Sequence, residues 1–173
     1  MCRRLLCYGD SNTYGYDPRS CFGGRYPESV RWTALLNAEG WKLINKGENG
    51  RSIPRSNQEI KAAVQTICSI EVDILTVMLG SNDLLQCPDL AAEVCGERMG
   101  RFLRAVLTQT QGGAKILLVA PPPMKLGAWV SDHRTLEESR RLAGCYERTA
   151  YQLGIAFADA GTWGVGLAYD GVH

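Results

Sequence analysis

The chain has 173 residues, of which 45% are apolar and 21% charged, which is the size of one domain with the composition of a soluble globular protein. Its 19 Lys and Arg residues nearly balance its 18 Asp and Glu residues, so the formal net charge is +1. That balance argues against nucleic acid as a partner, because nucleic-acid-binding proteins usually carry a basic surplus or stripe, and it removes polybasic attraction to anionic membranes.

The first half of the chain predicts two strands and two helices. A short apolar run at 5–8 predicts the first strand, and residues 9–27 follow it without a regular period. A weak amphipathic pattern from about 28 to 40 precedes a second strand at 41–44. Apolar residues at helical spacing then follow Asn57, a residue type suited to an N-cap, and predict a second helix.

The second half continues the same alternation. We expect a strand at 72–79, followed by a helix that is capped by Asp89 and ended by Gly112 and Gly113. A strand at 115–120 and a non-periodic stretch at 121–135 come next. The last two elements are a helix marked by Leu142, Tyr146 and Leu153 and ended by Gly154, and a strand at 155–157. Glycine just past a helical pattern is a common C-terminal signal.

Alternating strands and helices predict an α/β fold, with a five-stranded parallel sheet between two helical layers in a three-layer α/β/α arrangement. We expect the flavodoxin-like strand order 2-1-3-4-5. In an open parallel sheet, ligands bind beyond the carboxyl ends of the strands, near the point where the strand order reverses. Long irregular stretches in a compact domain are usually functional, so residues 9–27 and 121–135 are the expected walls of a site there.

Polar groups follow the first three predicted strands. Ser11 follows the first strand, Gly50 the second and Asn82 the third. In the expected order strand one lies between strands two and three, so a hydroxyl, a backbone N–H and a carboxamide meet at one edge of the sheet. Near the end of the chain, Asp170 precedes His173 by three residues, so one tight turn brings the carboxylate to the imidazole.

These groups suit nucleophilic catalysis. A serine hydroxyl becomes an effective nucleophile when an imidazole removes its proton, and the imidazole needs an acceptor on its second nitrogen. Ser11, His173 and Asp170 are the candidates for these three catalytic roles. The oxyanion formed on the attacked carbonyl requires preorganised donors, for which we expect the N–H groups of Ser11 and Gly50 and the side chain of Asn82.

Each of these residues also has a simpler interpretation. Ser11 taken alone could be a loop serine that caps the next helix, and Gly50 could only supply a turn with positive φ. Asn82 could be a turn former, which is what we expect of its neighbour Asp83. We expect Asp10 to bind loop N–H groups rather than to act in catalysis.

Four sequence blocks, in order, resemble those of the SGNH-hydrolase (GDSL esterase) family. They are the Gly-Asp-Ser at 9–11, the Asn-x-Gly-x-x-Gly at 45–50, the Gly-x-Asn-Asp at 80–83 and the Asp-x-x-His at 170–173. Longer matches resemble the arylesterase/acyltransferase branch, namely Gly9–Tyr16, Val30–Trp32, Val119–Pro123 and Phe157–Gly161. The resemblance implies hydrolysis of short acyl esters, with acyl transfer to alcohols as a further activity.

The leading hypothesis is therefore a cofactor-free serine esterase that acts on a small acyl ester through a covalent acyl-enzyme. A carbohydrate O-deacetylase or a thioesterase would use the same machinery, and the sequence does not choose between these substrates. A non-catalytic binding module with this fold is the alternative from another class. The presence of Ser11, Asn82, Asp170 and His173 together counts against that module.

Aromatic and apolar residues of the two irregular stretches are the candidates for a substrate pocket: Tyr14, Tyr16, Met124, Leu126 and Trp129. Ordinary loop packing is the alternative for each of them. His133 stands in a Ser-Asp-His-Arg run. Consecutive residues cannot arrange a nucleophile, a base and an orienting acid around one another, so we expect a solvated loop or a helix start there.

The seven cysteines form no C-x-x-C pair, and the chain has two histidines. We therefore expect reduced, buried thiols and no metal site. Apolar runs such as 116–120 are far shorter than the roughly 20 residues that cross a bilayer, and the N-terminus lacks the apolar core of a signal peptide. We expect a cytoplasmic protein without a membrane span. The sequence does not decide whether the protein forms a homo-oligomer.

The chain ends at His173, directly after the fourth block, whereas members of the family it resembles continue into a closing helix. We expect residues 1–173 to form a single SGNH-hydrolase-like domain that lacks this helix, as a shortened form of a longer chain. The α-carboxylate of His173 would compete with Asp170 for the ring proton. We therefore expect His173 to sit away from Ser11.

Overall fold

The computed structural model describes residues 3–20, 22–36 and 40–173. Its strands are β1 (Arg3–Gly9), β2 (Trp41–Gly47), β3 (Ile74–Met78), β4 (Lys115–Ala120) and β5 (Ala156–Asp159). All neighbouring strands pair in parallel, in the order β2-β1-β3-β4-β5. The predicted α/β fold and strand order are confirmed.

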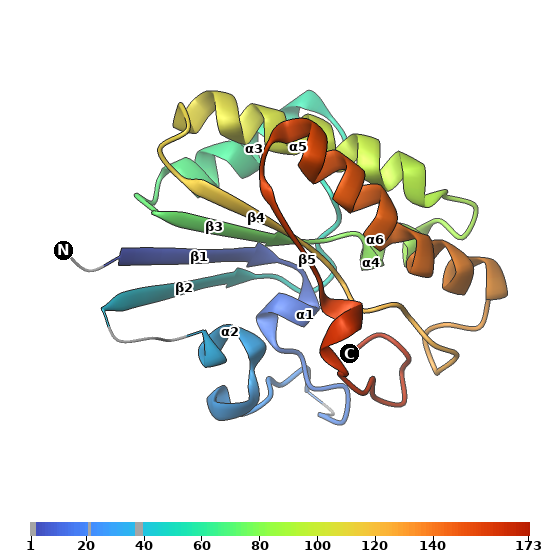
Figure 1. The fold of residues 1–173 in the computed structure, drawn as a ribbon. Helices are drawn as coiled ribbons and strands as arrows, with labels where there is room; N and C mark the ends of the chain where they lie inside the picture. The colour runs from blue at the N-terminus through green and yellow to red at the C-terminus, as the bar shows by residue number, and fades with distance from the viewer. Residues whose placement is uncertain (1–2, 21, 37–39) are drawn as a thin grey trace.

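Helices lie on both faces of this sheet (Figure 1). They are α1 (Ser11–Tyr14), α2 (Trp32–Leu35), α3 (Asn57–Cys68), α4 (Ser81–Gln86), α5 (Ala92–Thr110) and α6 (His133–Leu153), with 3₁₀ turns η1 (Glu28–Val30) and η2 (Ala160–Trp163). Figure 1 shows the three long helices α3, α5 and α6 on one face and the short α1 and α2 on the other. The C-terminus lies beside α1, at the edge where the strands end.

The main hydrophobic core fills the space between the sheet and the three long helices. Strand residues that point to this face are fully buried, as Leu6, Leu75 and Leu118 show, and they share the core with Phe102 and Tyr146 of the helices. Burial of each such side chain stabilises the fold by about 1.5–3 kcal/mol relative to exposure. The strand registers, which pair Gly9 with Gly47 and with Met78, place the carboxyl ends of β1, β2 and β3 side by side.

A smaller cluster covers the opposite face. Met78, Val119 and Ala160 are buried there, and Trp32 of α2 packs against them. The helix predicted from 28 to 40 is broken, because Arg31 adopts an extended conformation with ψ 128° between η1 and α2. Residues 37–39 of that prediction lie outside the described residues.

Two helix starts differ from the predicted N-caps. Ser56, rather than Asn57, caps α3: its hydroxyl accepts from the Glu59 N–H, and the Glu59 carboxylate accepts from the Ser56 N–H. This is the reciprocal capping box. Asp89 lies upstream of α5 and forms an ion pair with Arg134 at 3.2 Å. The N-cap of α5 is Ala91, and the Ala92 N–H donates instead to the Glu138 carboxylate of α6 at 2.7 Å.

The described cysteines are free thiols of two kinds. Cys7, Cys95 and Cys145 are buried, whereas Cys68 and Cys87 are exposed, which corrects the expectation of burial for those two. The remaining two cysteines lie outside the described residues. Within the part of the chain that the structure describes, none of the helices has the length and apolar character needed to cross a membrane.

Candidate active site

Ser11 is the first residue of α1 and follows β1 after a sharp turn. Asp10 is the N-cap of this helix, and its carboxylate accepts a hydrogen bond from the Asn12 N–H at 3.0 Å. Asp10 thus binds a backbone N–H of α1 rather than of a loop, and Ser11 is a helical residue rather than a cap. A Cβ on Gly9 would lie 2.7 Å from the Met78 carbonyl oxygen, so only glycine allows the chain to turn this closely to β3.

Ser11, His173 and Asp170 form one hydrogen-bonded chain. The Ser11 Oγ lies 2.7 Å from His173 Nε2, and His173 Nδ1 lies 2.6 Å from Asp170 Oδ2. The Ser11 residue is 7% exposed and Asp170 is fully buried. The expectation that His173 sits away from Ser11 is therefore wrong.

Backbone pairing explains why the segment that carries Asp170 and His173 reaches Ser11. The loop before α6 donates three hydrogen bonds to this segment: Lys125 to Gly171 at 3.0 Å, Ala128 to Tyr169 at 3.0 Å and Trp129 to Asp170 at 3.1 Å. A Cβ on Gly127 would lie 2.5 Å from the Asp170 carbonyl carbon. The Tyr169 hydroxyl also donates to the Pro18 carbonyl at 2.8 Å, so both irregular stretches hold the segment.

Hydrogen bonding keeps the buried Asp170 carboxylate ionised. Burial acts to raise the pKa of this carboxyl, but the Val172 N–H, the His173 ring and the His173 N–H together outweigh burial and lower the pKa. The ionised Asp170 accepts a hydrogen bond from Nδ1–H of His173, which keeps the ring proton on Nδ1. Nε2 is then the unprotonated nitrogen that can accept the Ser11 proton.

Gly50 and Asn82 follow the two strands that flank β1. Gly50 has φ 77°, which confirms the turn with positive φ, and a Cβ there would meet open space. The Asn82 carboxamide donates to the Arg51 carbonyl at 3.1 Å, which leaves its second N–H for another acceptor. Their roles as oxyanion donors stay predictions.

Asp83 is not the turn former that the sequence suggested. It is fully buried in α4, accepts from the Ile53 N–H at 2.9 Å and pairs with Arg98 at 3.3 Å and Arg55 at 3.7 Å. Burial raises the pKa of its carboxyl, against the Ile53 N–H and the two arginines. Asn82 donates a hydrogen bond to the loop after β2, and Asp83 accepts one from it, so both residues hold this loop in place.

Two of the five predicted pocket residues lie against His173. The Tyr16 ring centroid is 4.8 Å from that of His173, and the Trp129 ring meets the imidazole edge-on at 5.2 Å. Tyr16 and Trp129 are themselves 5.8 Å apart. Under these rings the His173 side chain is only 2% exposed, so the aromatic pair shields the imidazole from water.

The other three predicted pocket residues lie elsewhere. Tyr14 stacks under the guanidinium of Arg25 at 4.2 Å. Met124 is 3% exposed and belongs to the main core, so ordinary packing explains it. Leu126 lines a separate cavity of about 440 Å³ together with His133, and His133 starts α6 as expected.

Comparison with known proteins shows which family the chain belongs to. The sequence profile of the GDSL-like lipase/acylhydrolase family matches residues 7–173. The chain belongs to that family. The resemblance to SGNH hydrolases is thereby confirmed, and the GDSL-like protein is a carboxylic ester hydrolase.

Solved structures similar to this GDSL-like hydrolase include esterases of three bacteria. A proposed arylesterase from Agrobacterium tumefaciens is 31% identical, with a TM-score of 0.86 over 99% of this chain and 89% of the other. A carbohydrate acetylesterase family member from Sinorhizobium meliloti is 28% identical, with a TM-score of 0.85 over the same shares of 99% and 89%. The aryl esterase of M. smegmatis, 24% identical with a TM-score of 0.88 over 99% and 90%, shares the fold. No curated protein matches the chain significantly.

The sequence did not reveal how three contributors to the site act. Asp83 is the last residue of the Gly-x-Asn-Asp block, but the sequence does not show that α4 turns this carboxylate inward. The bonds from residues 125–129 to the last segment are made by backbone groups, which no side-chain pattern reveals. Arg51 stands next to Gly50, and only the structure shows where its long side chain lies.

Proposed function

We propose that this GDSL-like hydrolase is a serine esterase for short acyl esters, with Ser11 as nucleophile, His173 as general base and Asp170 as the acid that orients the imidazole. The observation that carries the proposal is the unbroken hydrogen-bonded chain, 2.7 Å from Ser11 Oγ to His173 Nε2 and 2.6 Å from Nδ1 to Asp170. Both distances suit proton transfer and orientation in a triad.

The reaction follows from this arrangement. Ser11 Oγ attacks the ester carbonyl as its proton passes to His173 Nε2, and the carbonyl oxygen becomes an oxyanion near the N–H groups of Ser11 and Gly50 and the Asn82 carboxamide. Collapse breaks the bond to the alcohol, which leaves with the proton from His173. Water then attacks the acyl-Ser11 ester by the same steps, and an alcohol in place of water gives acyl transfer.

The surroundings of the triad favour a short acyl group. Ser11 is 7% exposed, and the Tyr16 and Trp129 rings lie against the imidazole that must accept its proton. A long acyl chain would have to displace these rings. We therefore expect an acetyl or propionyl group to be accepted more readily.

A second candidate is removal of acetyl groups from a carbohydrate. It is supported by the similarity to the Sinorhizobium meliloti structures, described as a carbohydrate acetylesterase family member and as a carbohydrate acetylesterase, each at 28% identity. The chemistry at Ser11 is unchanged, because a sugar hydroxyl then serves as the leaving group. The two candidates differ only in the alcohol part of the ester.

A substrate panel tests the proposal. Turnover of p-nitrophenyl acetate, butyrate and octanoate and of an acetylated sugar is measured for the wild type, for Ser11→Ala and for Ser69→Ala, an exposed serine beyond α3 that serves as control. We expect kcat/KM to fall from acetate to octanoate, and Ser11→Ala to keep at most the residual of about 10³–10⁴ over water that binding and oxyanion donors supply. Wild-type turnover by Ser11→Ala would overturn the nucleophile, and a preference for octanoate would overturn the short acyl group.

A further inference from the structure

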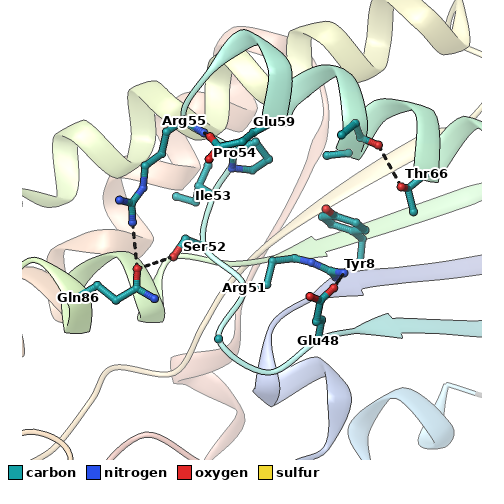
Figure 2. Close-up of a pocket in the computed structure, with 13 residues that line it drawn as sticks. Tyr8, Glu48, Arg51, Ser52, Ile53, Pro54, Arg55, Glu59, Thr66 and Gln86 are labelled. Carbon is teal, nitrogen blue, oxygen red and sulfur yellow. Dashed lines mark hydrogen bonds and ion pairs between the residues drawn. The ribbon is translucent and has the colours of Figure 1, made fainter.

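Arg51 follows Gly50 in the loop between β2 and α3, and its side chain is held rather than solvated. It lines a cavity of about 530 Å³ beside the ends of β1 and β2. Figure 2 shows the guanidinium lying against Tyr8 and reaching Glu48. Its central carbon is 4.2 Å from the Tyr8 ring centroid, and the side chain is only 16% exposed. Such stacking and burial immobilise a side chain that is normally flexible.

The guanidinium joins the ends of two strands. Nη1 donates to the Gly9 carbonyl at 2.8 Å and also to the Lys46 carbonyl, while Nη2 pairs with the Glu48 carboxylate. Gly9 is the last residue of β1 and directly precedes the turn that presents Ser11. Lys46 lies in β2. The planar fork of fixed donors allows these bonds at once, which the single ammonium of lysine does not reproduce.

The backbone of Arg51 completes the connection. Its N–H donates to the Glu48 carbonyl at 3.2 Å, which closes the turn containing Gly50. Its carbonyl accepts from the Asn82 carboxamide at 3.1 Å. One residue therefore contacts the end of β1 through its side chain, and the Gly50 turn and Asn82 through its backbone.

From these contacts we propose that Arg51 is a positioning residue, which holds Gly50 and Asn82 at a fixed distance from Ser11. The inference rests on the proposed function, since it requires oxyanion donors at these two positions. The oxyanion exists only after Ser11 attacks. Misplaced donors therefore stabilise the transition state less, while the affinity for the ester stays nearly the same. A displacement of 1 Å at such a site lowers the rate by about 10²-fold.

The experiment compares Arg51→Met and Arg51→Lys with the wild type. Arg4→Met serves as matched control, because Arg4 lies at the opposite end of β1 in an exposed ion pair with Glu71. We expect Arg51→Met to lower kcat for p-nitrophenyl acetate about 10²-fold with KM nearly unchanged. Arg51→Lys, which restores the charge but not the fork, is expected to fall between Arg51→Met and the wild type. Arg4→Met is expected to retain wild-type kcat.

A second readout does not depend on turnover. In ¹⁵N-labelled protein, Arg51→Met is expected to shift the resonances of the Gly50 amide and the Asn82 carboxamide, and Arg4→Met is expected to leave them in place. Wild-type kcat in a folded Arg51 variant, or a loss confined to KM, would overturn the positioning role. If Arg51→Met does not fold, the same comparison of kcat, KM and resonances is made with Arg51→Lys.

The two proposals fail in different ways. If the wild type hydrolyses no ester and Ser11 is not acylated, the proposed function is wrong. The resonances then decide only whether Arg51 holds the Gly50 turn and Asn82 in place: unshifted Gly50 and Asn82 signals in Arg51→Met would overturn that structural part of the inference, and shifted signals would support it.

Discussion

Replacement of Asp170 by asparagine should prevent His173 from acting as a base, although the imidazole itself stays in place. Asp170 Oδ1 accepts from the N–H groups of Val172 and His173 at 3.0 and 3.1 Å, and Oδ2 accepts from the imidazole. In Asp170→Asn the amide oxygen keeps the two backbone donors, so the NH₂ group faces His173 Nδ1. Nδ1 must then be unprotonated, and the proton moves to Nε2, which donates to Ser11 instead of accepting from it.

The expected loss is large because water cannot take the place of the carboxylate. Asp170 is 0% exposed, and the same exchange in a serine-protease triad lowers kcat by about 10⁴-fold. At about 1.36 kcal/mol for each factor of ten, this corresponds to about 5.4 kcal/mol of transition-state stabilisation. We expect a loss of that order in kcat for Asp170→Asn, with little change in KM because the ester does not contact Asp170 before attack.

Steady-state kinetics with p-nitrophenyl acetate measures this effect. Asp89→Asn is the control, because its carboxylate is 93% exposed and distant from the triad residues in sequence. Circular dichroism and thermal melting of both variants establish that they are folded. A folded Asp170→Asn enzyme with kcat within tenfold of the wild type would refute the reasoning that the Asp170 carboxylate sets the tautomer of His173.

Three further predictions concern neighbouring residues. Asn82→Ala should lower kcat by about 10²–10³-fold with KM nearly unchanged; steady-state kinetics checks this, and a rise in KM alone would contradict the oxyanion role. Asp83→Ala leaves Arg98 and the Ile53 N–H without their carboxylate, so urea unfolding should show a loss of about 3 kcal/mol, and a loss below about 1 kcal/mol would be inconsistent with it. Burial raises the pKa of Asp10 to about 7, above its ordinary value of about 3.9. The folded state then holds this proton between these two pH values, so the free energy of unfolding should fall as pH rises across that window, by up to about 1.4 kcal/mol per pH unit. Asp10→Asn should flatten this slope, and equal slopes in both proteins would contradict the raised pKa.

The arrangement of the site could be predicted from the sequence because it follows from the order of the strands. Continuous apolar runs distinguish buried parallel strands from amphipathic helices, and the positions of Ser11, Gly50 and Asn82 just after three of those strands put them at one edge. The structure places His173 within hydrogen-bond distance of both Ser11 and Asp170. Alternation and spacing were sufficient to place Ser11, Gly50 and Asn82 at this edge, but not to place His173 beside Ser11.

The remaining features depend on tertiary contacts that have no local pattern. Gly80, at φ 124°, is the N-cap of α4, and Asp83 is buried on this helix, where a short polar run had suggested a turn. Met124 and Leu126 are neighbours in an irregular loop, yet one is in the core and the other is exposed. The position of His173 depends on backbone bonds from residues 125–129, which is why the expectation of a displaced imidazole was wrong.

Identification of the acylated residue tests most directly the claim that Ser11 is a nucleophile activated by His173. The enzyme is mixed with p-nitrophenyl acetate, quenched in acid during the first turnover, digested and mapped by mass spectrometry. We expect one acetyl group on Ser11, formed together with a burst of p-nitrophenol equal to the enzyme concentration and absent from Ser11→Ala. An acetyl group on another residue, or full turnover with Ser11 unmodified at every quench time, would contradict the account.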